Sequence, residues 1–254
     1  MLLQSQLIGL FGLGDPVFAL KARDSWIGWD LEMKKQRLYH IMDAYVLGAV
    51  PPYSHLLCGK LIAMLALSNE VRKAFYKKYL NRVSLIKKKK RLPYLAMITT
   101  TSALGRSSLY NRISINGFKY WNSIGFTQGS GEFHFSNGIY EGLRAFAEKH
   151  CEPTAKQSIW GTGFRNKREV VRKCLLKIGL SDELLFHGIQ REIFAAPLGK
   201  NALRFLQGEL RRPHFYNWAA EDLAKDFKER WLLDRAKRMP IFGDFLSDSY
   251  KLWK

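Results

Sequence analysis

Residues 38–67 read LYHIMDAYVLGAVPPYSHLLCGKLIAMLAL, and this stretch decides the fold. The apolar run from Leu38 to Val50 is typical of a buried strand, and Pro51-Pro52 ends it because proline donates no backbone hydrogen bond. Ser54 is a suitable helix N-cap, and the nearly all-apolar residues Leu56–Leu67 predict a buried helix behind it. A buried strand followed by a buried helix indicates a domain that mixes the two.

The segments on either side predict further strands and helices. Strands are predicted at Leu7–Leu13, Val17–Leu20, Tyr94–Thr101, Phe118–Phe126, Glu132–Phe135 and Gln190–Ala196. Helices are predicted at Asn69–Tyr79, Asn137–Lys149, from Asn166 onward, Asn201–Gly208 and Ala219–Leu233. We therefore expect a mixed α/β fold with a central mixed sheet in residues 1–136. A helical C-terminal extension with one added strand, residues 137–254, would pack on this core as one continuous domain.

Length and composition exclude several classes of protein. The chain has 254 residues, of which 47% are hydrophobic and 25% charged, so wholesale disorder and a disulfide mini-scaffold are excluded. Its three widely spaced cysteines form no CxxC pair, which argues against a zinc site and for a reducing compartment. No apolar stretch reaches the ~20 residues of a membrane span, and the apolar start lacks the basic flank of a signal peptide. We expect a cytoplasmic protein with no membrane partner, no metal and no cofactor.

The net charge of +19 favours a polyanionic partner. Residues 72–91 hold ten basic side chains and no acidic one, so they supply over half of this charge. We expect this segment and the helix after Asn166 to bind nucleic acid, DNA in preference to RNA, through Lys73, Lys77, Lys78, Lys87, Lys88, Lys89, Lys90, Arg91, Arg165, Arg168 and Arg172. The alternative is that the lysine run is only a solvated loop.

A polar cluster follows the strand predicted at Tyr94–Thr101, where sheets commonly hold ligands. Arg106 and Arg112 are candidates to bind phosphate, and Tyr110 is a candidate catalytic side chain. The candidate ligand-binding residues beside them are Ser102, Gly105, Ser107, Ser108 and Asn111. The alternative is a helix N-terminus at which Ser107 or Ser108 is only the cap.

Asp24 and His134 are the other two candidate catalytic residues. Asp24 lies beside a cation and near Trp26 and Trp29, which are candidate ligand-binding residues, although Asp24 could equally be a structural ion-pair partner. His134 shares a strand face with Glu132, an arrangement suited to acid–base chemistry near neutral pH, or is simply half-exposed. We expect Arg106, Tyr110 and Arg112 to share a cleft with Asp24 or His134.

Several longer motifs resemble one known family. They are ARDSWIGW at 22–29, VPPY at 50–53 with GKL at 59–61, TSALGRSSLYNR at 101–112, IGFT at 124–127 with GSG at 129–131, and HGIQRE at 187–192 with PL at 197–198. The chain resembles the DruA-type proteins of the Druantia anti-phage defence system over nearly its whole length. The resemblance implies a defence component that works with other proteins of the system, and members usually extend further at the N-terminus, a part we expect this chain to lack.

The order of elements is also similar to the core of acetyltransferase-like (GNAT) domains. In those domains, glycines where the helix begins expose backbone N–H groups to the cofactor pyrophosphate. Here the corresponding segment holds only Gly59, and its two prolines lack donors, so an acyl-CoA site is not expected. The leading function is a nucleic-acid-contacting component of phage defence. An acyl- or other group-transferase and a non-catalytic assembly protein stay open, as does whether any reaction is catalysed.

Overall fold

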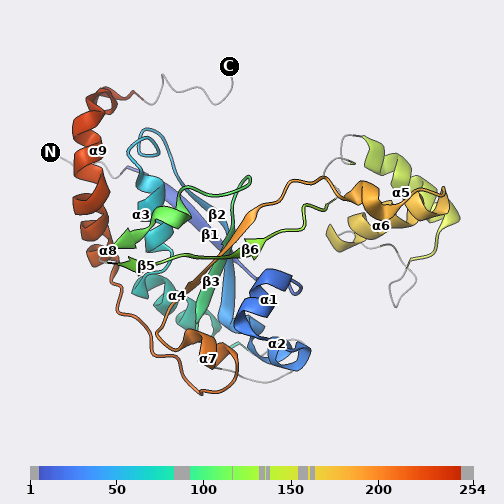
Figure 1. The fold of residues 1–254 in the computed structure, drawn as a ribbon, viewed down its shortest axis with the longest axis horizontal. Coiled ribbons are helices and arrows are strands. Elements are labelled where there is room, and N and C mark those ends of the chain that lie inside the picture. The colour runs from blue at the N-terminus through green and yellow to red at the C-terminus, as the bar shows by residue number, and fades with distance from the viewer. Residues whose placement is uncertain are drawn as a thin grey trace. The chain divides into compact units, whose positions relative to one another are not determined.

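The computed structural model describes residues 6–82, 92–115, 117–131, 135, 138–153, 160 and 164–246, with backbone only at residues 164, 165, 243 and 244. Two compact units are present (Figure 1). The first, here the sheet unit, comprises Met1–Gly125 and Glu192–Lys254, and the second, here the inserted unit, is Phe126–Arg191. The division at residue 136 that the sequence suggested is not one of these boundaries, because the chain returns to the sheet after the inserted unit.

A mixed five-stranded sheet, in the order β1-β2-β3-β7-β6, forms the centre of the sheet unit. Its strands are β1 (Gly9–Gly14), β2 (Ile41–Ala49), β3 (Met97–Thr101), β6 (Asn122–Phe126) and β7 (Glu192–Pro197), while β4 (Ser114–Ile115) and β5 (Phe118–Lys119) form a separate pair. β2 runs antiparallel to β1 and parallel to β3, and β3 runs antiparallel to β7. The expected mixed α/β class with a mixed sheet is confirmed.

The helices of the sheet unit are α1 (Lys21–Ile27), α2 (Leu31–Arg37), α3 (Cys58–Leu65), α4 (Asn69–Tyr79), α7 (Ala202–Leu206), α8 (Ala220–Phe227) and α9 (Leu233–Arg238). Shorter helical turns are η1 (Leu38–His40), η2 (Tyr110–Arg112), η4 (Asp182–Leu185), η5 (Lys228–Leu232) and η6 (Pro240–Asp244), of which η4 belongs to the inserted unit. The inserted unit also holds α5 (Ile139–His150) and α6 (Phe164–Lys177), whose buried residues Ala147 and Val170 pack together. No helix in the described part of the chain is long and apolar enough to cross a membrane.

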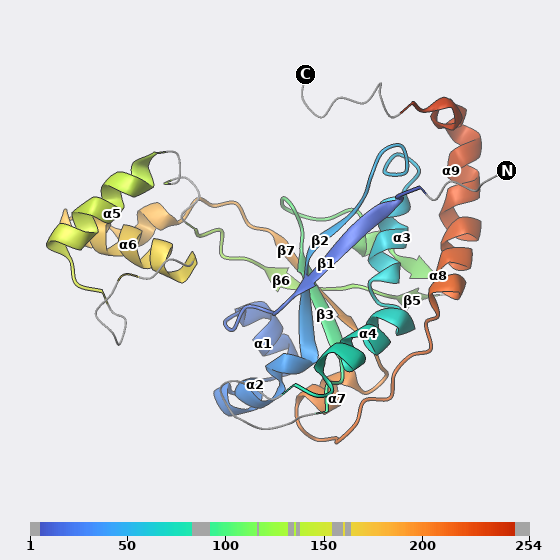
Figure 2. The ribbon, with the colours of Figure 1, turned by 180° about the vertical axis from the view of Figure 1, so that it is seen from behind.

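Both faces of the sheet are covered by helices (Figures 1 and 2). Successive strand residues point to opposite faces. Met42, Ile98 and Phe194 therefore pack in one core cluster with side chains of α3, α4 and α8. Ile41, Met97 and Ala195 pack in the other, with side chains of α1 and α7. The apolar run at 38–50 is thus explained, since β2 is buried on both faces where it pairs with β3.

The carboxyl end of β2 separates from β3 and leaves space for a pocket. Only Ile41–Asp43 pairs with β3, whereas β1 follows β2 along its length to Ala49. The carboxyl end of β2 therefore leaves β3, and the chain turns at residues 51–57 before α3 begins at Cys58. Ser54 is not the N-cap that the sequence predicted. Leu57 occupies that position in the left-handed conformation (φ 65°), which costs a leucine about 1–2 kcal/mol.

Two elements differ from the sequence prediction near the N-terminus. Val17–Leu20 is not a strand but precedes α1, which Gly28 ends in the left-handed conformation. Asp30 then caps α2, its side chain accepting a hydrogen bond from the N–H of Met33. The strand predicted at Glu132–Phe135 lies largely outside the described residues.

Candidate functional site

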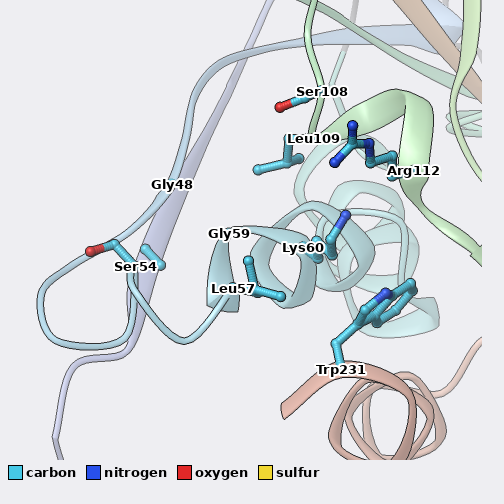
Figure 3. A pocket seen from close by; sticks show the side chains of 10 residues that line it. Gly48, Ser54, Leu57, Gly59, Lys60, Ser108, Leu109, Arg112 and Trp231 are labelled. Carbon is cyan, nitrogen blue, oxygen red and sulfur yellow. The ribbon is translucent and has the colours of Figure 1, made fainter. Parts of the chain in front are cut away.

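A pocket of about 500 Å³ lies where β2 leaves the sheet (Figure 3). Residues from the end of β2, the start of α3, the η2 turn and the C-terminal helices surround it. They are Gly48, Ala49, Ser54, Leu57, Gly59, Lys60, Ser108, Leu109, Arg112 and Trp231. These ten include two cations and no acidic side chain. The pocket therefore combines apolar walls with uncompensated positive charge.

Gly59 lets α3 approach the η2 turn closely. A Cβ at this position would lie 2.9 Å from Cδ1 of Leu109, closer than carbon atoms normally pack. Because this atom is the end of a flexible side chain, a shift of Leu109 would accommodate the Cβ, and packing favours the glycine of the GKL motif only weakly. Cys58, next to it, is buried, and burial raises the pKa of its thiol to about 11. The thiol stays protonated at neutral pH, which argues against a thiolate nucleophile here.

Lys60 is the unusual residue of this pocket. Its side chain belongs to a buried helix and only 8% of the residue is exposed. The Nζ atom lies 5.3 Å from the ring centroid of Trp231, and no ion pair or hydrogen bond joins it to the described residues. Burial lowers the pKa of Lys60, and the nearby charge of Arg112 lowers it further. Two like charges thus face one space without a carboxylate between them.

Glu192 at the start of β7 holds the polar loop that carries Arg112. Its carboxylate accepts hydrogen bonds from the backbone N–H of Ser107 at 3.0 Å and from Nδ2 of Asn111 at 3.1 and 3.3 Å. Burial alone would raise the pKa of Glu192. Hydrogen bonds from Ser123, Ser107 and Asn111, with the charge of Arg106, outweigh burial and lower the pKa.

Most of the predicted ligand-binding cluster belongs to this loop framework. Ser102 is buried, donates its hydroxyl hydrogen bond to the carbonyl of Gly105 and accepts one from the N–H of Glu192. Ser107 caps the η2 turn, because its Oγ accepts from the N–H groups of Leu109 and Tyr110. Ser108 and Arg112, in contrast, line the pocket. The cap alternative therefore describes Ser107, and the ligand alternative fits Ser108 and Arg112.

Tyr110 and Arg106 do not reach the pocket lining. Tyr110 is buried between Trp121 and Phe194, with ring centroids 5.3 and 4.9 Å away, and burial raises its pKa. A buried phenol in this environment is a core residue. Arg106 is exposed on the loop, where its charge acts on Glu192.

Asp24 is fully engaged in ion pairs on α1. Its Oδ1 accepts from Nε and Nη2 of the buried Arg23 at 2.9 and 2.6 Å, and its Oδ2 from Nζ of Lys34 at 2.9 Å. Trp26 and Trp29 are partly buried in the core cluster of α1 and α7, and Nε1 of Trp29 donates to the carbonyl of Leu206 at 2.7 Å. These contacts match the structural alternative for Asp24.

The cleft predicted to be shared by Arg106, Tyr110 and Arg112 with Asp24 is not seen among the described residues. Of Arg106, Tyr110, Arg112 and Asp24, Arg112 alone is among the pocket residues. His134 lies outside the described residues. Lys60 and Trp231 complete the pocket, and neither was predicted as a site residue. A single lysine within an otherwise apolar helix was the available signal for Lys60, whereas nothing local marked Trp231.

The predicted basic residues fall into three groups. Lys73, Lys77 and Lys78 are exposed on α4, and none of them forms an ion pair with a described residue. On α6, Arg168 donates to Oγ of Ser130 at 3.3 Å, and Nε of Arg172 lies 3.5 Å from Oδ2 of Asp182. Outside the described residues lie Lys87, Lys88, Lys89, Lys90, Arg91 and the side chain of Arg165. No group of three or more His, Cys, Asp or Glu side chains in the described part could hold a metal ion.

Comparison with known proteins gives the family. The family described as "Druantia protein DruA" matches residues 2–208, which include α3, the η2 loop and the inserted unit. The Druantia protein DruA of Escherichia coli (strain UMEA 4076-1) is 40% identical over 250 residues, which are 98% of this chain and 60% of that protein. The chain thus spans about three fifths of the length of this relative. No solved structure matches, so the similarity to acetyltransferase-like domains stays a prediction. The family match covers most of the chain, and the protein belongs to the DruA family.

Proposed function

We propose that this protein is a component of a Druantia anti-phage defence system and binds nucleic acid through the exposed face of α4. Membership of the DruA family supports the defence role. Because the chain spans only part of its relative, the role of the whole protein is part of the proposal. Other proteins of the same system are the partners that this role requires.

The observation that supports this proposal most directly is the excess positive charge on α4. Lys73, Lys77 and Lys78 are exposed and form no ion pair in the described part of the chain. The one acidic residue of this helix, Glu70, accepts a hydrogen bond from the N–H of Ala220 at 3.0 Å and interacts electrostatically with Lys73, so it offsets only one of the three charges. A cluster of exposed, unpaired lysines makes a positive field that attracts polyanions.

Not every cation of α4 belongs to this face. Arg72 donates to the carbonyl of Tyr216, and its guanidinium lies 4.1 Å from the ring centroid of Phe215. Arg72 therefore anchors α4 to the chain after α7 and is not free to bind phosphate. Tyr76, which lies between the lysines in the sequence and is 37% exposed, is a candidate ring for an unpaired base to stack on, a contact worth about 1–3 kcal/mol.

The test replaces all three lysines of the α4 face. In the variant Lys73→Gln/Lys77→Gln/Lys78→Gln, DNA affinity is measured by fluorescence anisotropy between about 50 and 200 mM salt. Losing up to three phosphate contacts reduces the log–log salt slope by roughly 2 to 3, since each contact contributes about 0.9 on duplex DNA. Arginine at the same three positions keeps the charge, and we expect it to keep the slope.

A charge-matched control comes from the C-terminal helices. Lys225, Lys228 and Arg230 are exposed there among the acidic residues Glu221, Asp222 and Glu229, so their replacement with glutamine removes the same charge from a neutralised surface. An equal loss of affinity in both triple variants would mean that only net charge matters and would refute the α4 face. Binding of the protein to an acidic protein partner, without DNA binding, would instead favour the assembly role.

A further inference from the structure

The pocket at the end of β2 holds a positive charge that the described residues do not pair. Lys60 is more than nine-tenths buried as a residue, and it forms no ion pair or hydrogen bond with the described residues. Its ammonium group lines the pocket, while the apolar stem is held in the core (Figure 3). A lysine held in this way, with its charge presented to a pocket, is suited to bind an anion from outside the chain.

Arg112 adds a second positive charge to the pocket. Figure 3 shows Lys60 from α3 and Arg112 from η2 extending toward the same space. Their mutual repulsion is large enough to act on the ionisation of Lys60. Arg112 is itself held in place indirectly, because Glu192 fixes the loop before it through Ser107 and Asn111. The two charges are thus positioned by separate parts of the fold, which is the arrangement of a built anion site.

We propose that this pocket binds the phosphate group of a nucleotide, held between Lys60 and Arg112. Phosphate suits the pair because a guanidinium donates to two of its oxygens at once while an ammonium adds a point charge. Ser108 adds a hydroxyl to the same wall. The bound phosphate supplies the negative charge that the described lining lacks.

The rest of the pocket fits the organic part of a nucleotide. Leu57, Leu109 and Trp231 give it apolar walls, and its volume of about 500 Å³ lies within the usual range of about 300–1,000 Å³ for small-molecule sites. A mononucleotide fits such a pocket, whereas the width of a duplex does not. The ligand is therefore either a free nucleotide or the terminal nucleotide of a strand.

This inference is independent of the α4 face. Lys73, Lys77 and Lys78 do not line the pocket, so neutralising them leaves nucleotide binding unchanged. Conversely, a variant in the pocket keeps the salt slope for internal duplex DNA. The experiments can therefore refute DNA binding by α4 and nucleotide binding by the pocket separately.

The experiment measures binding of adenosine 5′-monophosphate and adenosine to the full chain by calorimetry. We expect the phosphate to improve affinity at least 10-fold, and Lys60→Met and Arg112→Gln each to lower affinity for the monophosphate roughly 10- to 100-fold, as expected for charge-assisted hydrogen bonds. The same variants leave the weaker binding of adenosine unchanged.

A second arm identifies the source of the nucleotide. A short single strand is compared with and without its 5′-phosphate, again with the parent and the Lys60→Met chain. Phosphate-dependent binding of the strand but not of the mononucleotide assigns the pocket to strand ends, and the reverse assigns it to a free nucleotide. If neither ligand shows a phosphate effect that Lys60→Met removes, the proposal is wrong.

Loss of binding through misfolding is excluded by a stability measurement. Lys60→Met removes a buried charge and keeps the length of the side chain, so the ligand-free variant unfolds at the same temperature as the parent or higher. Added mononucleotide raises the unfolding temperature of the parent and not of the variant. A variant that unfolds at a lower temperature would show that Lys60 is a structural residue, which overturns the proposal.

Discussion

Arg23 and Lys60 are both buried cations of the sheet unit, yet their surroundings are opposite. Arg23 is fully buried and gives hydrogen bonds to the carboxylate of Asp24 and to the carbonyls of Val17 and Phe18. Lys60 lines the pocket beside the ring of Trp231 and near the charge of Arg112, and no described residue pairs with it. A cation that is paired with a carboxylate and hydrogen-bonded to carbonyls is held by the fold itself, whereas a cation that lines a pocket without an anion is available to a ligand. The contrast separates a structural cluster from a binding site more clearly than residue type does.

The largest change in stability is expected from removing the partner of Arg23. Asp24→Ala leaves Arg23 and Lys34 without their carboxylate, so we expect a loss of about 3–5 kcal/mol in the free energy of unfolding. Urea denaturation measures the loss. The control Glu32→Ala breaks the exposed pair with Lys35 and is expected to cost at most about 1 kcal/mol. Equal losses in the two variants would show that the Arg23 cluster is not what stabilises α1.

Glu192 extends the comparison to a buried anion. Glu192→Gln replaces a carboxylate that accepts from Ser107 and Asn111 with a neutral amide, and we expect a loss of about 1.5–3 kcal/mol. The pKa of Glu192 is lowered in the folded state, so its contribution is present above the ordinary value of 4.5 and is lost as pH falls through the lowered value. Urea denaturation between neutral and acid pH should therefore show a steeper decline for the parent than for the variant. Parallel declines would contradict this role.

The sequence predicted the scaffold of the site better than the site itself. The strand predicted within 38–50 is β2 at Ile41–Ala49, which the η1 turn precedes. The turn at Pro51-Pro52 and the helix behind it are seen, and α4 matches the predicted bounds Asn69–Tyr79. Apolar patterning is a local signal, which is why it was sufficient for these elements, whereas the cap predicted at Ser54 was wrong. The helices α1 and α2 were missed, although Gly28 and Asp30 carried the end and cap signals of each.

The charges of the site depend on contacts that sequence patterns do not contain. Arg106 and Arg112 occur within one polar cluster and both are exposed, yet of the two only Arg112 is among the pocket residues. Glu192, which follows the inserted unit in the sequence, holds the loop between them through Ser107 and Asn111. Trp231 reaches Lys60 from a C-terminal helix. Such pairings require the fold, since no spacing in the sequence links them.

A smaller effect of opposite sign tests the Lys60 side of the comparison. In the absence of ligand, Lys60→Met replaces a lysine whose charge no described residue pairs by an apolar side chain of similar length. We expect a gain of about 1 kcal/mol, which corresponds to a rise of about 2–4 °C in Tm for a chain of this size. Arg23→Met, the matched change in the paired cluster, should lower Tm. Thermal unfolding gives the Tm of both variants. A Tm of Lys60→Met below that of the parent would show that Lys60, like Arg23, stabilises the fold.

The smallest expected effect is the pH dependence of that gain. Burial lowers the pKa of Lys60 from its ordinary 10.5, so between the lowered value and 10.5 the unfolded chain binds more protons than the folded one. The free energy of unfolding of the parent therefore rises with pH through this window, relative to Lys60→Met, and the advantage of the variant shrinks. Urea denaturation of both proteins at neutral and alkaline pH measures the difference.

Bound phosphate supplies the missing counter-charge and favours the protonated lysine, so saturating mononucleotide should abolish the alkaline gain in the parent. An advantage of Lys60→Met that stays constant with pH would mean that the ammonium is already compensated within the protein, and the contrast with Arg23 would disappear.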